Sequence, residues 1–245
     1  MNVVVFGATS CIAAAVTRRL AERGDRLFLV GRSPEKLAAQ VGALGEAVVG
    51  SIAGDLDELE ANEGRIEAAE RALGTIDLAV LAHGLLGDQL ATEADLAAAR
   101  AVLTTNLLSP VSILLPLAQR MEAQRAGALA VITSVAGERG RPRNYTYGAA
   151  KGGLSIYLEG LRSRLHDAGV TVTDLKLGPV DTPMTVDHPK NALFATPEQA
   201  AAAILRAIDG RKGEAYVPGY WRPIMAGVRS LPEPLFQRFG FLSGR

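Results

Sequence analysis

The sequence predicts an α/β fold in which a parallel sheet is covered by helices on both faces. Short apolar runs alternate with longer segments rich in Ala, Leu, Glu and Arg. Most of the apolar runs are continuous, as expected of strands buried on both sides. Strand, helix and strand repeated in this order imply right-handed crossovers and a doubly wound sheet.

The expected elements follow one another without a linker as far as residue 210. Six strands are predicted, at Val3–Phe6, Leu27–Val30, Ala47–Val49, Leu78–Ala82, Leu129–Thr133 and Val170–Leu177. Helices are predicted over Ile12–Arg23, Glu58–Leu73 and Asp95–Val102. We therefore expect one Rossmann-like domain over residues 1–217 and a C-terminal extension over residues 218–245.

Composition and charge exclude several classes of protein. The 26 basic and 26 acidic residues cancel, so a body built to bind nucleic acid through bulk charge is not expected. The single cysteine, Cys11, excludes a disulfide framework, and three scattered histidines show no metal-ligand spacing. The stretch Ala101–Gln119 has no charge but contains two prolines, which favours a buried helix over a membrane span. With no leader at the N-terminus, a cytoplasmic protein is expected.

The C-terminal extension differs from the rest of the chain. Residues 216–245 hold six of the twelve aromatic residues, and residues 211–245 hold six basic and two acidic ones. Two short helices are expected to begin near Pro223 and Pro234, because proline suits a first helical position. An aromatic and basic composition suits peripheral contact with a membrane or with a lipid phosphate. The alternative is that these aromatic side chains pack on the protein's own sheet or on another subunit.

Four strand ends carry residues suited to a dinucleotide. The first strand ends at Gly7-Ala8-Thr9-Ser10-Cys11-Ile12, a turn of small residues whose backbone N–H groups can face a pyrophosphate at the start of a helix. The second ends in Arg32, where an acidic residue would bind a ribose 2′-hydroxyl. Because arginine suits a 2′-phosphate instead, NADP(H) is predicted over NAD(H). Asp55-Leu56 and Gly84 follow the next two strands, at the edge where ligands bind.

A second group of residues suits proton transfer. Ser134 follows the fifth strand, and Tyr147 and Lys151 are one turn apart on a predicted helix. An ammonium beside a phenol favours the phenolate, so we expect Lys151 to lower the pKa of Tyr147. The pair could then donate a proton to a carbonyl oxygen or accept one from an alcohol.

Taken together and in order, these residues closely resemble the short-chain dehydrogenase/reductase family. The set is Gly7, Asp55, Gly84, Asn106, Ser134, Tyr147, Lys151 and Gly178-Pro179-Val180-Asp181-Thr182, and the resemblance covers residues 2 to about 210. It implies an NADP(H)-dependent oxidoreductase that transfers hydride between nicotinamide and a carbonyl or alcohol.

Tyr147 would be the acid/base, while Lys151 would lower its pKa and hold the nicotinamide ribose. Ser134 would bind the substrate oxygen and Asn106 a water of the proton relay. Pro179, Val180 and Thr182 would contact the cofactor. A homodimer or homotetramer is also implied.

Two segments depart from the family pattern. Cys11 and Ala13 occupy positions where the family usually has glycine. The family's Asn-Asn-Ala-Gly is here Leu81-Ala82-His83-Gly84, so only the glycine carries over, and His83 is interpreted as a packed or surface residue.

Asn106 also has a feature that the residues themselves suggest. Pro110 lies four residues later and has no N–H, so it cannot bond the Asn106 carbonyl in a regular helix. We therefore expect that carbonyl to be free to bind a water.

The motifs identify a reaction more closely than a substrate. The tail, with residues 7–13, 82–87 and 134–140, resembles the branch of the family that includes decaprenylphosphoryl keto-ribose reductase, which implies a polyprenyl-phosphate keto sugar as substrate. The alternative is a soluble ketone, steroid or acyl thioester. A non-catalytic nucleotide sensor is the alternative from another class, and the presence of Asn106, Ser134, Tyr147 and Lys151 together argues against it.

Overall fold

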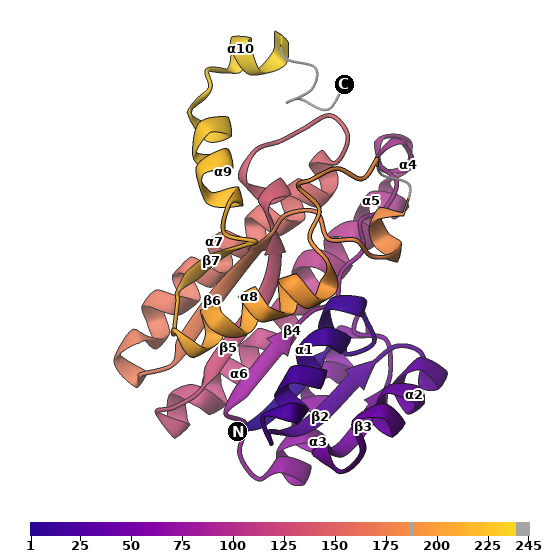
Figure 1. Cartoon of the computed structure of the whole chain (residues 1–245), viewed down its shortest axis with the longest axis vertical. Coiled ribbons are helices and arrows are strands. Elements are labelled where there is room, and N and C mark those ends of the chain that lie inside the picture. The colour runs from indigo at the N-terminus through magenta and orange to yellow at the C-terminus, as the bar shows by residue number, and fades with distance from the viewer. Residues whose placement is uncertain (187–188, 239–245) are drawn as a thin grey trace.

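The computed structural model describes residues 1–186 and 189–238, so the predicted tail residues Phe239, Phe241 and Arg245 lie outside the described part. Seven parallel strands form one sheet in the order β3-β2-β1-β4-β5-β6-β7, which confirms the predicted doubly wound architecture (Figure 1). The strands are β1 Asn2–Phe6, β2 Arg26–Gly31, β3 Val48–Ala53, β4 Leu78–Leu81, β5 Ala128–Ser134, β6 Thr171–Leu177 and β7 Glu214–Val217. The strand β7 was not among those predicted.

Helices cover both faces of the sheet and extend beyond it (Figure 1). They are α1 Cys11–Glu22, α2 Pro34–Leu44, α3 Asn62–Leu73, α4 Gln89–Ala94, α5 Leu96–Leu103, α6 Ser109–Gln124, α7 Tyr145–Leu165, α8 Pro197–Asp209, α9 Trp221–Ser230 and α10 Glu233–Arg238. One buried cluster joins the sheet to α3, α6 and α7, and a second joins it to α1, α2 and α8. The continuous apolar strands of the sequence are therefore explained by burial on two sides.

The helical run Leu96–Gln124 is long and apolar enough, by length and composition alone, to cross a membrane. Half of its most apolar window is buried inside the protein. The run is not one regular helix, because a π-helical turn, Thr104–Leu108, separates α5 from α6. Its packing against α3 and α7 agrees with the buried helix expected from the sequence.

The sheet order reverses between β1 and β4, which are neighbours although two strands separate them in the chain. Connections leave β1 and β4 toward opposite sides at this point, so their carboxyl ends border a crevice where ligands bind in open α/β sheets. The turn that starts at Gly7 and the loop that contains Gly84 lie at these two ends. The architecture thus brings the two halves of the predicted cofactor site together.

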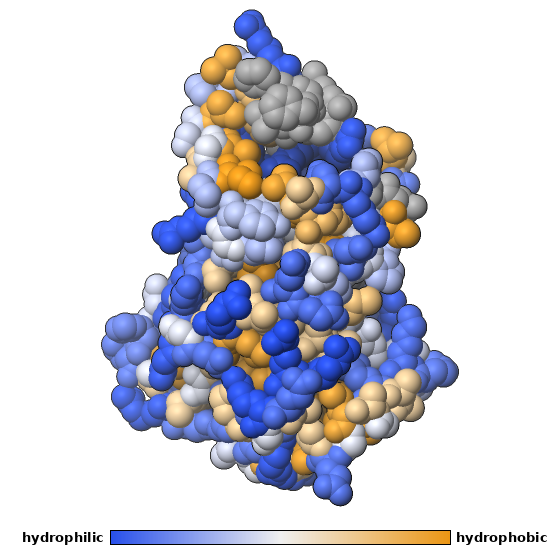
Figure 2. Space-filling model, in the orientation of Figure 1, coloured by the Kyte–Doolittle hydropathy of each residue, from blue (hydrophilic) through white to orange (hydrophobic). Residues whose placement is uncertain are grey.

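The described part of the tail, residues 218–238, packs on the end of the domain that carries the loop after β5. Trp221, Met225, Val228 and Phe236 form a small buried cluster with Val135. In the space-filling view, hydrophobic side chains gather along this part of the molecule (Figure 2). The tail therefore packs one apolar face on the protein itself, one of the two interpretations that the sequence allowed, while Tyr220 and Leu235 remain exposed.

Candidate active site

The turn after β1 presents backbone donors to the crevice. Gly7 has φ +75°, a conformation that favours glycine, and the N–H groups of Gly7 and Ala8 both bond to Val30. Ser10 caps α1 by accepting from the Ala13 N–H at 3.2 Å. Among the described residues, no protein acceptor bonds the backbone N–H groups of Thr9, Cys11 and Ile12. These free donors at a helix N-terminus fit the pyrophosphate of a dinucleotide.

The other predicted cofactor residues border the same edge of the sheet. Arg32 is exposed directly after β2, and Cys11 is exposed at the first position of α1. Asp55 accepts from the Asp57 N–H at 3.1 Å, which shapes the loop after β3. The Leu56 carbonyl accepts from Asn62 and Ser109 at 2.9 and 2.8 Å. This loop is therefore tied to α3 and α6.

His83 is a packed, neutral residue. The Ser109 hydroxyl gives its proton to the Leu56 carbonyl at 2.8 Å, so it must accept from His83 Nε2, which lies 3.0 Å away. Burial, with a smaller effect of the Lys151 charge, lowers the pKa of His83 to about 3. A Cβ on Gly7 would lie 2.7 Å from the backbone nitrogen of His83, so His83 packs directly against the turn that starts at Gly7. We assign it no role in the chemistry.

Asn106 lies fully buried in the π-helical turn before α6. Its amide nitrogen donates to the carbonyls of Leu85 and Val102 at 2.6 and 2.8 Å, and its amide oxygen accepts from the Leu85 N–H at 3.2 Å. A Cβ on Gly84 would lie 3.0 Å from that oxygen and 3.6 Å from Lys151 Nζ. Asn106, Gly84 and Lys151 are therefore neighbours, although they come from three different elements.

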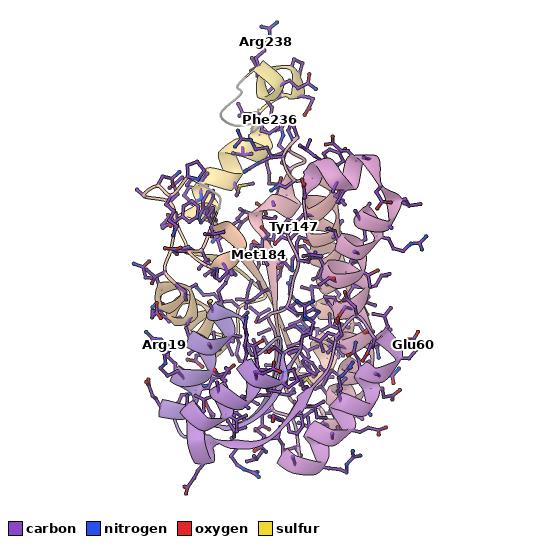
Figure 3. All side chains as sticks on the ribbon, turned by 90° about the vertical axis from the view of Figure 1, so that its right-hand side faces the viewer. Arg19, Glu60, Tyr147, Met184, Phe236 and Arg238 are labelled. Atoms are coloured by element: carbon purple, nitrogen blue, oxygen red, sulfur yellow. The ribbon has the colours of Figure 1, made fainter. Side chains whose placement is uncertain are left out.

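Tyr147 and Lys151 lie in the first turns of α7, close to Ser134. The Lys151 ammonium donates to the Ile132 carbonyl at 2.9 Å and is 5.9 Å from the centroid of the Tyr147 ring. Ser134 accepts from the Ala136 N–H at 3.1 Å and donates to the Leu177 carbonyl at 3.3 Å. In Figure 3 Tyr147 lies in the upper half of the domain, with Met184 of the segment after β6 near it in that view.

Two glycines explain how α7 comes so close to the loop after β5. A Cβ on Gly148 would be 2.7 Å from the Ala136 carbonyl oxygen, and one on Gly152 would be 2.6 Å from that of Gly137. Any side chain at these positions would push the helix away from the loop. Residue types alone identified the polar members of the site but not these two contacts.

The electrostatics of the pair differ from the prediction. Burial raises the pKa of Tyr147 to about 12, and only its hydrogen bond with Ser134 acts in the opposite direction. Burial lowers the pKa of Lys151 to about 8, and the charge of Asp174 opposes that shift. The expectation that Lys151 lowers the pKa of Tyr147 was wrong, because burial of the phenol raises that pKa above its usual value.

The turn after β6 completes this edge. Val180 pairs with Ala195, and the Pro179 carbonyl accepts from the Ala195 N–H at 3.1 Å. Thr182 caps a short helical turn, Pro183–Thr185.

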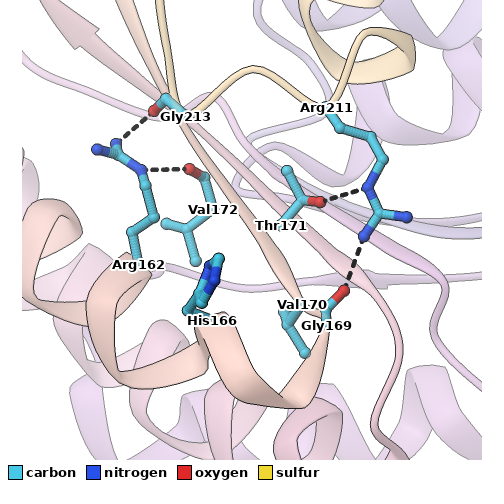
Figure 4. Close-up of a pocket in the computed structure, with 8 residues that line it drawn as sticks. All are labelled: Arg162, His166, Gly169, Val170, Thr171, Val172, Arg211 and Gly213. Atoms are coloured by element: carbon cyan, nitrogen blue, oxygen red, sulfur yellow. Dashed lines mark hydrogen bonds between the residues drawn. The ribbon is translucent and has the colours of Figure 1, made fainter.

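Two hollows lie elsewhere, at the amino-terminal edge of the strands, where Arg162 and Arg211 line the smaller one (Figure 4). Both arginines already donate to backbone carbonyls, so this region is a structural brace.

Comparison with known proteins agrees with this geometry. Residues 1–192 match the model of the short chain dehydrogenase family. An uncharacterised oxidoreductase of Mycobacterium tuberculosis is 38% identical, with 96% of each chain covered. Another, from Streptomyces coelicolor, is 36% identical over 97% of this chain and 95% of its own. A short-chain dehydrogenase from Burkholderia cenocepacia, solved with NADP, superimposes with a TM-score of 0.83 at 24% identity, over 96% of this chain and 95% of that chain.

The protein belongs to the short-chain dehydrogenase/reductase family. It is an oxidoreductase of that family, an NAD(P)-dependent enzyme that transfers hydride.

Proposed function

We propose that the protein is an NADP(H)-dependent carbonyl reductase or alcohol dehydrogenase with Tyr147 as its acid/base. The observation that carries this proposal is the meeting of Tyr147, Lys151, Ser134 and Asn106 beside the crevice between β1 and β4. When bound, the nicotinamide would supply or accept the hydride. The free N–H groups of Thr9, Cys11 and Ile12 would hold the pyrophosphate, with Pro179, Val180 and Thr182 near the nicotinamide.

The protein's own residues would manage the proton. The Tyr147 hydroxyl donates to the carbonyl oxygen as hydride reaches the carbon, and Ser134 orients the same oxygen. Lys151 keeps a positive charge near the tyrosinate that forms, which stabilises it. Asn106 is a neighbour of Lys151, and its backbone carbonyl could hold a water that resupplies the proton.

The preference for NADP(H) rests on Arg32. It is exposed at the end of β2, where a guanidinium can meet a 2′-phosphate, and Gly31 beside it adds no carboxylate. The similar Burkholderia structure contains NADP, which supports the same choice.

The substrate proposed is a carbonyl on a large apolar molecule, with a polyprenyl-phosphate keto sugar as the specific candidate. Exposed apolar residues, Met184, Val186, Leu193 and Tyr220, lie in or beside the segment after β6. The Tyr220 hydroxyl donates to the Leu193 carbonyl at 2.9 Å, which joins the tail to that segment. Arg222 is exposed next to Tyr220 and could meet a lipid phosphate at the inner face of a membrane. The alternative, a soluble ketone, steroid or acyl thioester, needs no such contact.

The test is NADPH oxidation by the wild-type protein across soluble ketones, acyl thioesters and polyprenyl-phosphate keto sugars presented in anionic vesicles. We expect turnover with NADPH exceeding that with NADH, and the highest kcat/KM for the lipid-linked sugar. A higher kcat/KM for a soluble carbonyl would refute the substrate proposal and leave the reaction intact.

Tyr147→Phe tests the mechanism with the best substrate of that panel. We expect turnover to fall by about 10²–10⁴-fold, because the variant has no proton to donate. The Kd for NADPH, measured by fluorescence titration, should change little. The exposed Tyr145→Phe variant is the matched control and should keep full activity. Turnover by Tyr147→Phe near that of the control would contradict the assigned role.

A further inference from the structure

The tail lies directly on the residues that neighbour the site. Trp221 is 6% exposed, and its indole nitrogen is 1.9 Å from the place that a Cβ on Gly178 would take. Gly178 opens the turn that contains Pro179 and Thr182. Trp221 also packs with Val135, the residue after Ser134. The first helix of the tail therefore contacts both loops that carry site residues.

Arg139, in the loop between Ser134 and Tyr147, makes four contacts with the tail. Arg139 donates to the carbonyls of Val228 and Leu231 at 2.6 Å each, and to the Glu233 carboxylate at 2.9 Å. Its guanidinium carbon lies 3.9 Å from the centroid of the Phe236 ring. The side chain of Arg139 is only 12% exposed. It thus contacts the last turn of α9, the connection that follows, and Glu233 and Phe236 of α10.

These contacts require an arginine. The last carbonyls of a helix lack intrahelical donors, and a cation there also opposes the negative end of the helix dipole. Only the planar guanidinium has donors pointing to three acceptors while its face stacks on an aromatic ring. A lysine could satisfy one or two of the acceptors.

The neighbouring Glu138 fixes the same loop from the other side. It is 5% exposed and accepts from the Tyr216 hydroxyl at 2.6 Å and from the Lys176 ammonium at 2.9 Å. Arg229 of α9 approaches the same oxygen at 3.7 Å. Gly137 of this loop lies against Gly152 of α7. The position of the loop therefore affects the helix that carries Tyr147 and Lys151.

We propose that Arg139 is a positioning residue, which fastens the tail to the loop after β5 and so holds Ser134 and the Gly178–Thr182 turn in place for the reaction. The proposal rests on the proposed function for its catalytic part. Its structural part is independent, because Trp221 is the only tryptophan of the chain and reports the packing of the tail by its own fluorescence.

The experiment compares Arg139→Gln with Arg143→Gln, an exposed arginine of the same loop that serves as the control. In Arg139→Gln we expect kcat to fall at least ten-fold and KM for the carbonyl to rise, while the Kd for NADPH stays within two-fold. The emission of Trp221 should shift to longer wavelength as water reaches it. Arg139→Lys should recover part of kcat, and the control should match the wild type in all four quantities.

Wild-type kcat in Arg139→Gln, or a loss of thermal stability with kcat intact, would overturn the proposal. If Arg139→Gln does not fold, Glu233→Gln removes the exposed partner of Arg139 instead. The proposal would also be overturned if both Glu233→Gln and Arg139→Lys kept the wild-type kcat and the wild-type Trp221 emission. A wild-type protein that reduces no carbonyl refutes the proposed function, whereas the emission shift still decides whether Arg139 holds the tail.

Discussion

Lys151 carries its charge at a place that water barely reaches, since the side chain is 2% exposed. Its one hydrogen bond among the described residues goes to the Ile132 carbonyl, and its counter-charge, Asp174, is itself buried and held by Thr133. Burial lowers the pKa of Lys151 to about 8, from 10.5 in the unfolded chain. The residue is therefore placed for chemistry at the expense of stability, as is common in active sites.

This conflict predicts that Lys151→Met is inactive but more stable. Below pH 8 the lysine is charged in both states, so the folded protein bears the full penalty of burying the charge, about 3 kcal/mol. Above pH 8 the folded state releases the proton first, and the penalty disappears as the pH approaches 10.5. The stability gain of the variant should therefore be largest at pH 7 and less than half as large at pH 9.5.

Urea unfolding of both proteins at the two pH values measures this difference. Lys36→Met, which removes an exposed lysine at the start of α2, is the control and should show no such trend. A gain for Lys151→Met that is the same at both pH values would mean that the charge is not what destabilises the protein. The lost bond to Ile132 affects both pH values equally and does not alter the trend.

At the scale of elements, the π-helical turn between α5 and α6 places Asn106. The Ser109 N–H donates to the backbone carbonyl of Thr104, five residues earlier, which is the spacing of a π-helix. Pro110 follows within the first turn of α6, and without an N–H it cannot restore regular α-helical bonding at Asn106. The wider turn agrees with the expectation that this carbonyl is not bonded as in a regular helix.

Pro110→Ala tests whether the turn matters for the reaction. The new N–H allows the regular α-helical bond to the Asn106 carbonyl, which would compete with a bound water and shift the Asn106 side-chain amide away from Leu85. We expect turnover to fall by about ten-fold and its pH profile to change, since small displacements at a reacting centre are costly. Pro116→Ala, inside α6 and away from the site, is the control. Turnover and a pH profile like those of the control would show that the proline is irrelevant to the relay.

At the scale of the whole molecule, the tail is part of the domain's packing. Removal of residues 218–238 would expose Val135 and Gly178, both of which Trp221 covers. A truncated chain would therefore test folding and catalysis together with any membrane contact. Charge reversal at the exposed Arg222 leaves the buried cluster intact and is the better variant for measuring binding to anionic vesicles.

The sequence by itself predicted the sheet, most strand positions and the polar residues that the fold brings together in the candidate site. Continuous apolar runs predict strands because a strand buried on both faces needs apolar side chains on both. Polar residues at strand ends predict a site because parallel sheets bind ligands at the carboxyl ends of their strands. Tyr147, Lys151, Ser134 and Asn106 could be identified because their chemistry is specific to residue type and order. The short edge strand Glu214–Val217 escaped prediction because four residues give too weak a pattern.

Only the tertiary structure decided what surrounds those residues. Three features depend on atoms that are far apart in the chain. Gly148 and Gly152 allow the loop after β5 to approach α7, burial raises the pKa of Tyr147, and Arg139 bonds the carbonyls at the end of α9. The aromatic and basic tail is the clearest case. Its composition fitted a membrane surface and a packed layer equally well, because hydrophobic burial does not depend on what covers the side chain. The contacts of Trp221 and Phe236 assign its buried face to the protein itself.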